Sequence, residues 1–266
     1  MKVQLQKVAP GEIEARSMEI IQSELGERTF PPEVLPVVKR VIHTTADFDY
    51  ADSLIFSPGA VEKGVAALRA GCAIVTDTQM ARAGINKRVL ESFGGEALCF
   101  MSDPDVAREA GERGITRAAV SMERAARLDR PMILALGNAP TALVRACELV
   151  EEGALRPELI VGVPVGFVNV VESKELLLTE PVPHIVARGR KGGSNVAACI
   201  CNAMLYLASG GRRGGGGGQG GRKERYWWAP SGPALPAPRR RRSSPSSGTS
   251  PGGCRDGSSA GPSPAG

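Results

Sequence analysis

The stretch Met132-Ile-Leu-Ala-Leu-Gly-Asn-Ala-Pro140 decides the fold class. Its first five residues form an apolar run of strand length, which ends at a glycine and an asparagine before a proline suited to the first turn of a helix. A strand without polar alternation must be covered on both faces, as in a parallel sheet between two layers of helices. The stretch therefore predicts one strand and helix unit of an α/β fold.

The same pattern recurs along the chain, where apolar runs alternate with amphipathic stretches. Short buried strands that alternate with helices are typical of a mostly parallel sheet with helices on both faces, and we expect this α/β fold as a single domain over residues 1–209. The other expected strands are 72–75, 97–101, 159–163 and 184–187, and the expected helices are 10–26, 33–40, 59–70, a segment from 80 or 86 to 93, 104–114, 121–128, 140–152, 170–179 and 194–208.

Four polar loops follow expected strands, at residues 76–78, 137–141, 164–167 and 188–194. Ligands of parallel sheets lie beyond the carboxyl ends of the strands, so we expect these loops to converge on one edge. The last loop combines the glycine pair at 192–193 with Arg188, Arg190 and Lys191, and Ser194 is placed to cap the following helix. It predicts an anion site, with a solvated glycine-rich turn as the alternative. Its lysine precedes the glycines, which excludes the usual phosphate-binding loop of nucleotide hydrolases.

Charge and composition divide the chain near residue 210. Residues 210–266 hold ten basic and two acidic residues, together with 16 of the 33 glycines and 8 of the 20 prolines, which leaves 23 basic and 26 acidic residues in 1–209. Such a segment cannot bury enough apolar surface to fold, so we expect 210–266 to be a disordered tail. Its arginine run 239–242 could contact nucleic acid, but we do not expect a dedicated nucleic-acid partner.

Cysteine usage and hydropathy indicate a soluble cytoplasmic protein. The six cysteines form no pair with the spacing of a redox or zinc motif, and the polar N-terminus does not resemble a secretion signal. No apolar run approaches the roughly 20 residues that span a bilayer, so we expect no membrane segment. Asp47, Asp49 and Asp52 are possible metal ligands, but no second histidine is nearby, so we expect capping or hydrogen bonding and no metal.

His43 is the candidate catalytic residue. It is one of two histidines, and it lies between Arg40 and a segment rich in hydroxyls and carboxylates, Thr44 to Asp49. An imidazole has an unperturbed pKa of about 6.5, so it can give or take a proton near neutral pH without a metal. The alternative is a histidine that is hydrogen-bonded at the edge of the core. His184, at the start of an expected strand, is expected to be structural.

Several segments in order resemble the precorrin-8X methylmutase family, also called precorrin isomerases. The resemblance is carried by Val-Ile-His-Thr-Thr-Ala-Asp-Phe-Asp-Tyr-Ala-Asp-Ser-Leu at 41–54 and by six further blocks, spread over about residues 10–208. These are Glu-Ala-Arg-Ser-Met-Glu-Ile-Ile at 14–21, Phe-Ser-Pro-Gly-Ala at 56–60, Thr-Asp-Thr at 76–78, Gly-Asn-Ala-Pro-Thr-Ala-Leu at 137–143, Gly-Val-Pro-Val-Gly-Phe-Val at 162–168 and Gly-Arg-Lys-Gly-Gly-Ser at 189–194.

The resemblance implies an isomerase of cobalamin biosynthesis. Such an enzyme would move a methyl group from C-11 to C-12 of precorrin-8X to give hydrogenobyrinate, or act on the cobalt-bearing equivalent. His43 matches the family's proton donor and acceptor, and Ser17 and Arg40 match positions that contact the substrate. An intramolecular migration needs no cofactor. The resemblance also implies a homo-oligomer, and it does not extend into the tail.

Two other classes of function stay open on sequence grounds. A phosphate-binding α/β enzyme would use Arg190 and Lys191 and would not need His43. A noncatalytic tetrapyrrole carrier would bind the ring whether or not His43 could exchange a proton.

Overall fold

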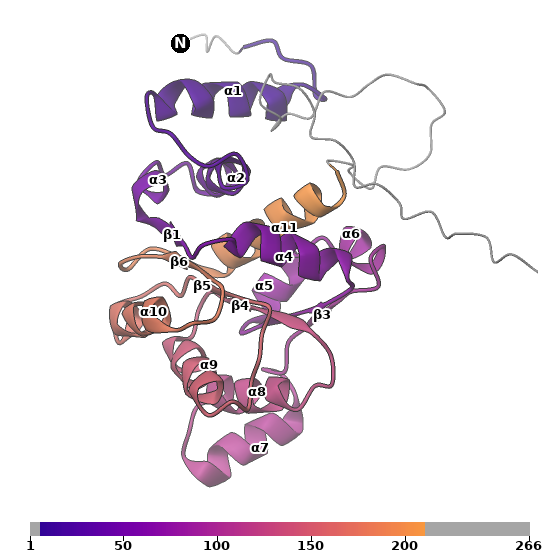
Figure 1. The fold of residues 1–266 in the computed structure, drawn as a ribbon, viewed down its shortest axis with the longest axis vertical. Coiled ribbons are helices and arrows are strands. Elements are labelled where there is room, and N and C mark those ends of the chain that lie inside the picture. Colours follow the sequence, from indigo (N-terminus) through magenta and orange to yellow (C-terminus); the bar gives the residue numbers. More distant parts are fainter. Residues whose placement is uncertain (1–5, 211–266) are drawn as a thin grey trace, which may run out of the picture. The chain divides into compact units, whose positions relative to one another are not determined.

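The apolar run 132–136 forms a strand in the middle of a six-stranded sheet in the computed structural model, which describes residues 6–210 (Figure 1). The strand order is β1-β6-β5-β4-β2-β3, and every neighbouring pair except β1 and β6 is parallel. The strands are β1 (Leu54–Phe56), β2 (Ala73–Thr76), β3 (Glu96–Leu98), β4 (Met132–Leu136), β5 (Leu159–Gly162) and β6 (His184–Ala187). The expected α/β fold with a mostly parallel sheet is confirmed.

The two faces of the sheet contribute to two separate apolar cores. In β4, Ile133 and Ala135 join one core, whereas Met132, Leu134 and Leu136 join the other. Successive side chains of a strand point to opposite faces, so a strand that is buried on both sides must be apolar throughout. This requirement explains why the run 132–136 has no polar position.

Helices cover both faces, as the sequence predicts (Figure 1). Residues of the first layer pack into the core that contains Ile133, and those of the second layer into the core that contains Leu134. The first layer comprises α1 (Ile13–Leu25), α2 (Leu35–Thr45), α3 (Tyr50–Ser53), α4 (Ala60–Arg69), α5 (Gln79–Gly84), α6 (Lys87–Glu91) and α11 (Ser194–Ala208); the second comprises α7 (Pro104–Arg113), α8 (Arg117–Ala126), α9 (Pro140–Glu151) and α10 (Val170–Thr179).

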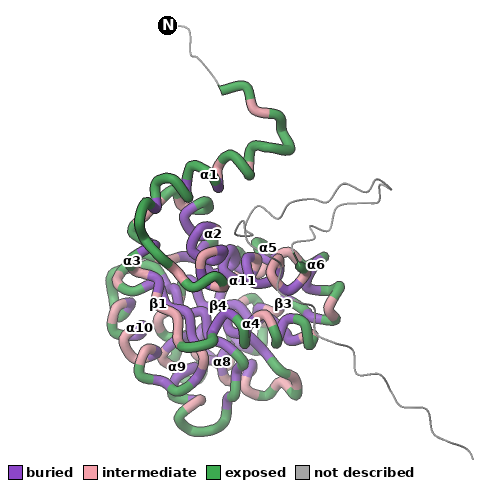
Figure 2. Tube along the Cα trace, turned by 45° about the horizontal axis from the view of Figure 1, so that its top comes forward, coloured by how far each residue is buried: buried purple, intermediate pink, exposed green. Residues whose placement is uncertain are grey.

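Helix α11 is the central element of the first layer. Most of its side chains are buried, and it packs against α2, α4 and α5 as well as the sheet (Figure 2). A helix that is apolar on all sides is stable only when it is surrounded, and its alanines and cysteines allow close approach. On α4, a Cβ at Gly64 would lie 2.6 Å from Met204 Sδ, so a larger residue there would displace the Met204 side chain. By contrast, α1 is largely exposed in Figure 2.

The structure corrects several element boundaries, and the strand expected over 97–101 is shorter, since β3 ends at Leu98. The helix expected over 33–40 is α2, which continues to Thr45, so His43 lies in its last turn and not after it. The segment expected between 80 or 86 and 93 is two helices, because Asn86 interrupts it and caps α6 by accepting a hydrogen bond from Val89 N. Helix α8 begins at Arg117, four residues earlier than expected, because Thr116 caps it.

The antiparallel edge strand β1 was not expected. It pairs Leu54 with Ala187 and Phe56 with Ile185. A three-residue strand has too few positions to show an apolar periodicity, and β1 is specified by its pairing with β6.

Residues 211–266, and with them nearly all of the expected disordered tail, lie outside the described residues. Within residues 6–210, none of the helices has both the length and the apolar character that crossing a membrane requires.

The loops at the carboxyl edge of the sheet are tied together by Asp77. This residue follows β2 and is fully buried, and its carboxylate accepts hydrogen bonds from the backbone N–H groups of Gly137, Asn138 and Ala139 at 3.0, 2.7 and 2.7 Å. Those three residues form the loop between β4 and α9. Asp77 therefore holds two of the four expected site loops in one arrangement.

We predict that Asp77→Asn lowers the free energy of unfolding by about 3 kcal/mol, because an amide cannot accept from all three buried N–H groups. Urea unfolding at neutral pH measures the effect. Asp129→Asn, at an exposed aspartate, is the matched control and should change stability by less than about 0.5 kcal/mol. Equal effects of the two substitutions would contradict the role of Asp77.

Candidate active site

His43 is exposed on the last turn of α2, and Arg40 lies one turn before it on the same side of the helix. Partial burial lowers the pKa of His43 below its usual value, and the positive charge of Arg40 lowers it further. The imidazole is therefore neutral at neutral pH, with its ring accessible from solvent. A neutral, accessible imidazole can accept a proton and return it.

Arg40 connects three elements of the first layer. Its guanidinium lies 3.0 Å from a carboxylate oxygen of Glu14 on α1, and 5.1 Å from the centre of the Tyr206 ring on α11. Burial lowers the pKa of Arg40, and its side chain is only 12% exposed. Arg40 is therefore held in place by an ion pair and by an aromatic face.

Ser17 lies one turn after Glu14 on α1, so the Glu14–Arg40 pair brings Ser17 to the junction of α1 and α2. Its hydroxyl donates to the carbonyl of Ile13 at 2.9 Å, within its own helix. Ser17 also lines a hollow of about 310 Å³ with Val8, Ile13 and Ile20. Neither Arg40 nor His43 lines that hollow. The structure thus places Ser17 one turn from Glu14, the partner of Arg40, and does not join the three predicted residues in one cavity.

The four expected loops do converge at the carboxyl edge of the sheet. Beyond the Asp77 contacts, the hydroxyls of Thr78 and Ser194 are hydrogen-bonded at 2.7 Å, and Gly193 N donates to Val163 O at 2.9 Å. A Cβ at Gly137 would lie 2.6 Å from Gly193 O, so the second and fourth loops approach each other as closely as backbones can. The expected convergence is confirmed.

The loop over 188–194 differs from the expected three-base anion site. Arg188 forms a bidentate ion pair with Glu175, and Lys191 Nζ lies 2.6 Å from carboxylate oxygens of both Asp47 and Asp49. The two carboxylates raise the pKa of Lys191, and Lys191 lowers the pKa of Asp47. Two of the three bases therefore have acidic partners already. Those partners could not be inferred from sequence, since Asp47 and Lys191 are far apart along the chain.

The remaining base, Arg190, is exposed, and its guanidinium lies 5.4 Å from the centre of the exposed Phe167 ring. Ser194 also differs from expectation. Gly193 occupies the capping position of α11, and the Ser194 hydroxyl bonds to Thr78 instead. The glycine stands there because its φ of 135° is one that side-chain-bearing residues rarely adopt.

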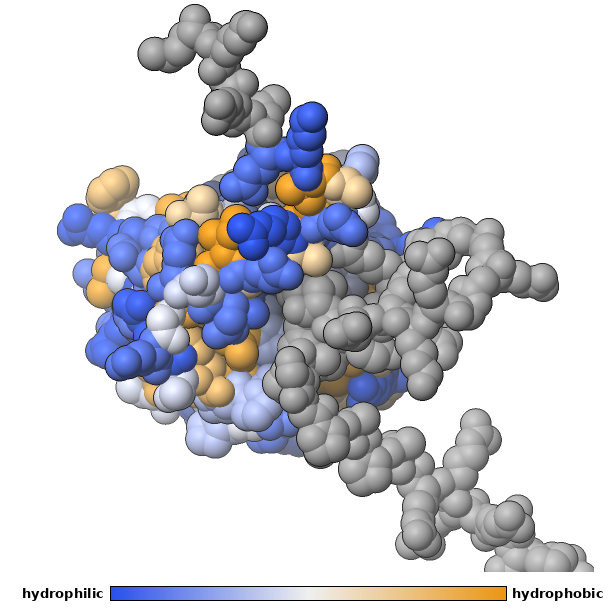
Figure 3. Space-filling model, turned by 90° about the horizontal axis from the view of Figure 1, so that it is seen from above, coloured by the Kyte–Doolittle hydropathy of each residue, from blue (hydrophilic) through white to orange (hydrophobic). Residues whose placement is uncertain are grey.

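Exposed apolar side chains accompany these polar groups. Met80, Val165, Phe167 and Val168 are 46–82% exposed, and all four come from the loops that follow β2 and β5 or from the first turn of α5. Figure 3, seen from the α1 side, shows apolar patches among charged side chains. A surface of this kind suits a ligand with a large apolar ring and charged substituents.

His184 and the two aspartates at 47 and 49 have structural partners. The Nδ1 atom of the buried His184 lies 2.9 Å from Val182 O, in agreement with the structural role expected for this residue. Asp47 and Asp49 are joined by Lys191, as described above. Among the described residues, no group of three or more His, Cys, Asp or Glu side chains is arranged to hold a metal ion.

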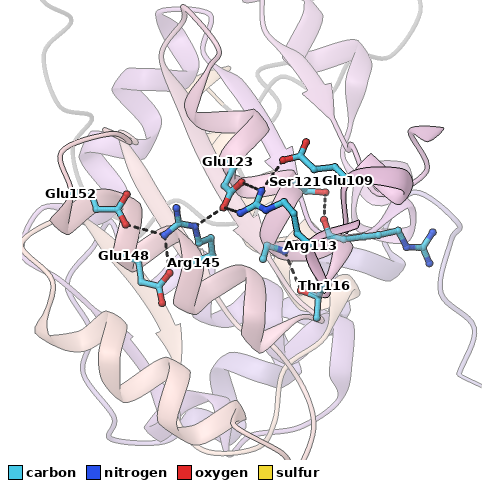
Figure 4. Close-up of polar contacts among 10 residues, drawn as sticks. Glu109, Arg113, Thr116, Ser121, Glu123, Arg145, Glu148 and Glu152 are labelled. Atoms are coloured by element: carbon cyan, nitrogen blue, oxygen red, sulfur yellow. Dashed lines mark hydrogen bonds and ion pairs between the residues drawn. The ribbon is translucent and has the colours of Figure 1, made fainter. Parts of the chain in front are cut away.

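The second helical layer contains a larger hollow, of about 640 Å³, between α8 and α9. It is crossed by an ion-pair network in which Glu123 accepts from both Arg113 and Arg145, and Arg145 also reaches Glu148 and Glu152 (Figure 4). The arginines lower the pKa of Glu123. The charges of this network are paired with one another. The network contains no exposed neutral imidazole of the kind found at His43.

Sequence reasoning missed two members of the site, Glu14 and Tyr206, which hold Arg40. Glu14 stands in the same helical block as Ser17, at the spacing of one turn, and this spacing was the available signal. Tyr206 gave no signal, because it lies far along the chain and reaches Arg40 only through the packing of α2 on α11.

The known proteins that this chain resembles belong to one family. A model of the precorrin-8X methylmutase family matches residues 12–207. The chain is 49% identical to the cobalt-precorrin-8 methylmutase of Salmonella typhimurium, over 74% of this chain and 95% of that protein. It is 45% identical to the cobalt-precorrin-8 methylmutase of Priestia megaterium, over 76% and 89% of the two chains. The precorrin-8X methylmutase of Pseudomonas aeruginosa is 39% identical, over 71% and 91%.

A solved structure of the precorrin-8X methylmutase from Thermus thermophilus superimposes with a TM-score of 0.69 at 41% identity, covering 75% of this chain and 98% of that one. Fold, sequence blocks and relatives thus point to the same family. The chain belongs to the precorrin-8X methylmutase family, whose members are isomerases of cobalamin biosynthesis.

Proposed function

We propose that this enzyme moves a methyl group from C-11 to C-12 of precorrin-8X to give hydrogenobyrinate, or converts cobalt-precorrin-8 to cobyrinate, with His43 as the proton donor and acceptor. The observation that carries this proposal is the exposed imidazole of His43 beside Arg40. The reaction is an isomerisation, so atoms balance without a methyl donor. What the protein must supply is one proton, its return, and a fixed orientation of the ring.

His43 performs both proton steps in this mechanism. Its lowered pKa leaves the free imidazole neutral, and Arg40 is one cause of that lowering. A ligand carboxylate that approaches Arg40 offsets the positive charge and raises the pKa of His43, so the imidazole gains a proton when the substrate binds. The imidazolium protonates the macrocycle, the methyl group migrates between adjacent carbons, and the imidazole takes the proton back.

Arg40 and Ser17 are proposed to orient the substrate. Arg40 can form a charge-assisted pair with a peripheral carboxylate, and the Ser17 hydroxyl can donate to another. Residues 1–209 hold more acidic than basic residues, so a polyanionic ligand cannot be attracted by the overall charge. Local donors, including the exposed Arg190 and the loop that carries it, must supply the attraction.

The cobalt-bearing substrate has the stronger support. The two relatives named cobalt-precorrin-8 methylmutase are 45% and 49% identical to this chain, whereas the Pseudomonas precorrin-8X methylmutase is 39% identical. We therefore expect faster turnover of cobalt-precorrin-8 than of the cobalt-free form, in the cytoplasm.

We predict that His43→Ala lowers turnover by about 10²- to 10⁴-fold, because it removes the general acid and base. The measurement is the change in the absorption spectrum of precorrin-8X, with and without cobalt, during incubation with purified protein. His43→Gln is the matched variant that keeps side-chain size without proton exchange, and it should be equally slow. Both variants should retain ligand affinity, measured by ultrafiltration of the coloured macrocycle. Conversion by neither wild type nor variant, despite binding, would indicate a tetrapyrrole carrier.

We predict that Arg40→Gln raises the pKa of His43, because one of the two causes that lower it is removed. Proton NMR titration of the His43 ring measures this, with His43→Ala to assign its signals. The same substitution should weaken macrocycle binding by about tenfold, the value of a charge-assisted hydrogen bond. Arg108→Gln, at an exposed ion pair on α7, is the control and should change neither quantity. An unchanged His43 pKa in Arg40→Gln would refute the electrostatic coupling.

We also propose that the enzyme is a homo-oligomer with α1 at a subunit interface. Ile13 and Ile20 are 55% and 39% exposed and lie two turns apart on one side of α1, with Ser17 between them. Covering such an apolar strip with a second copy removes it from water and stabilises the assembly.

Sedimentation velocity should therefore give a mass that is a multiple of 27.9 kDa for wild type. Ile20→Glu should shift the protein toward monomer, because it places a charge in the contact. Lys63→Glu, at an exposed position on α4, is the control. A wild type that sediments as a monomer at all concentrations would overturn this assignment.

A further inference from the structure

Lys174 is a lysine in the middle of α10 whose side chain is fully buried. Its Nζ donates to the backbone carbonyls of Gly189 and Lys191, at 2.7 and 2.8 Å. Burying an ammonium group is costly unless its hydrogen bonds are satisfied. Both carbonyls belong to the loop between β6 and α11, so the conformation of this loop satisfies the buried charge.

The neighbouring residue on α10 holds the same loop from outside. Glu175 accepts two hydrogen bonds from Arg188, each at 2.8 Å. Two successive residues of α10 thus fix the loop over 188–191. Lys174 binds backbone carbonyls of the loop, and Glu175 binds the side chain of Arg188. The exposed Glu175–Arg188 pair contributes little by itself, because solvent screens it. Lys174 is the stronger of the two anchors.

The loop in turn holds the segment that ends the His43 helix. With its carbonyl bonded to Lys174, Lys191 extends its own side chain to Asp47 and Asp49. Asp47 N donates to the Thr45 hydroxyl, which donates to Val41 O inside α2. A continuous series of hydrogen bonds therefore runs from the buried ammonium to the last turn of α2, where His43 lies.

We propose that Lys174 is a positioning residue, whose buried ammonium fixes the loop over 189–193 and, through Lys191, the helix end that carries His43. The enzymatic part of this inference rests on the proposed function of His43 and of the loop. The structural part, that Lys174 orders the loop, stands on the contacts themselves.

Burial lowers the pKa of Lys174 to about 8. At neutral pH the group is an ammonium, and above pH 8 it becomes an amine whose hydrogen bonds are about half as strong. No charged neighbour contributes to the lowering. The charged and titratable groups on α10 and on the elements packed against it are Glu172, Glu175, Glu180, Arg145, Cys147, Glu148, Glu151, His184, Arg188, Arg190 and Lys191.

Limited trypsin digestion tests the structural part without substrate. Trypsin can cleave after the exposed Arg190 and Lys191, and cleavage after Arg127 between α8 and β4 is the internal reference. Lys174→Met, which keeps the buried volume and removes the donors, should accelerate cleavage at the loop by about tenfold relative to the reference. Lys63→Met, at an exposed lysine, should not. Equal loop cleavage in Lys174→Met and wild type would overturn the inference.

Steady-state kinetics test the enzymatic part, with cobalt-precorrin-8 or precorrin-8X as substrate. Lys174→Met should raise KM by about tenfold and change kcat by less than about threefold, because the loop orients ligand and donates no proton. Lys174→Gln, which restores amide donors without a titrating group, should recover part of the loss. In wild type KM should rise several-fold between pH 7 and 9, and in Lys174→Gln this rise should disappear.

The outcomes separate the two proposals. If the loop becomes sensitive to trypsin in Lys174→Met but wild type does not turn over either substrate, the proposed function fails and the ordering role of Lys174 remains. If wild type turns over substrate and KM is the same in wild type, Lys174→Met and Lys174→Gln at every pH, the positioning role fails. If Lys174→Met does not fold, the pH dependence of loop cleavage in wild type decides, and no change between pH 7 and 9 would overturn the inference.

Discussion

The loops at the carboxyl edge of the sheet have backbone N–H and C=O groups that cannot form hydrogen bonds between strands. Two buried charged side chains, Asp77 and Lys174, bind these groups instead. Asp77 accepts three N–H groups from the loop after β4, and Lys174 donates to two carbonyls of the loop after β6. A negative charge is thus matched with backbone donors and a positive charge with backbone acceptors. A buried polar group without a hydrogen bond costs free energy. Each loop is therefore held in the conformation in which its backbone groups bind the buried charged side chain. These two contacts hold the backbone of the loops after β4 and β6.

His43 is located by packing in a different layer. Helix α2 lies against α11, whose small and apolar residues allow close contact, and Arg40 is fixed between Glu14 and Tyr206. The edge loops reach this layer through Lys191, which bonds to the two aspartates just beyond α2. The candidate site is therefore assembled from two parts, the sheet edge and the helix pair, which are connected by the ion pairs of Lys191 and by the first residue of α11. A site built on packed helices and buried charges is better defined than one built on loops alone.

The sequence predicts those parts of the structure that local patterns specify. The strand over 132–136 and the helix over 170–179 match the structure, because a continuous apolar run and an amphipathic period are properties of neighbouring residues. The pairing of β1 with β6 and the partners of Lys191 were not predictable, since both depend on residues more than a hundred positions away. Ser194 is of a residue type that often caps helices, but its hydroxyl is hydrogen-bonded to Thr78 instead. His43 was a candidate by its residue type and neighbours, whereas Arg40 and Ser17 came from the family resemblance. The structure adds Glu14, whose only signal was its one-turn spacing from Ser17, and Tyr206, which no local pattern indicates.

The electrostatics of the free site suit a reaction that must begin only after the substrate has bound. Partial burial and the positive charge of Arg40 keep the neighbouring imidazole neutral, and Glu14 pairs with Arg40, so the acid of the proposed mechanism is not protonated before a ligand binds. A carboxylated macrocycle changes both conditions at once, since its negative charge favours the protonated imidazole. In the proposed mechanism the substrate itself thus raises the pKa of the acid that acts on it. A single histidine can therefore both donate and accept the proton in this mechanism. The negative charge that favours its protonated form comes with the ligand, and the burial and the positive charge that favour its neutral form belong to the fold.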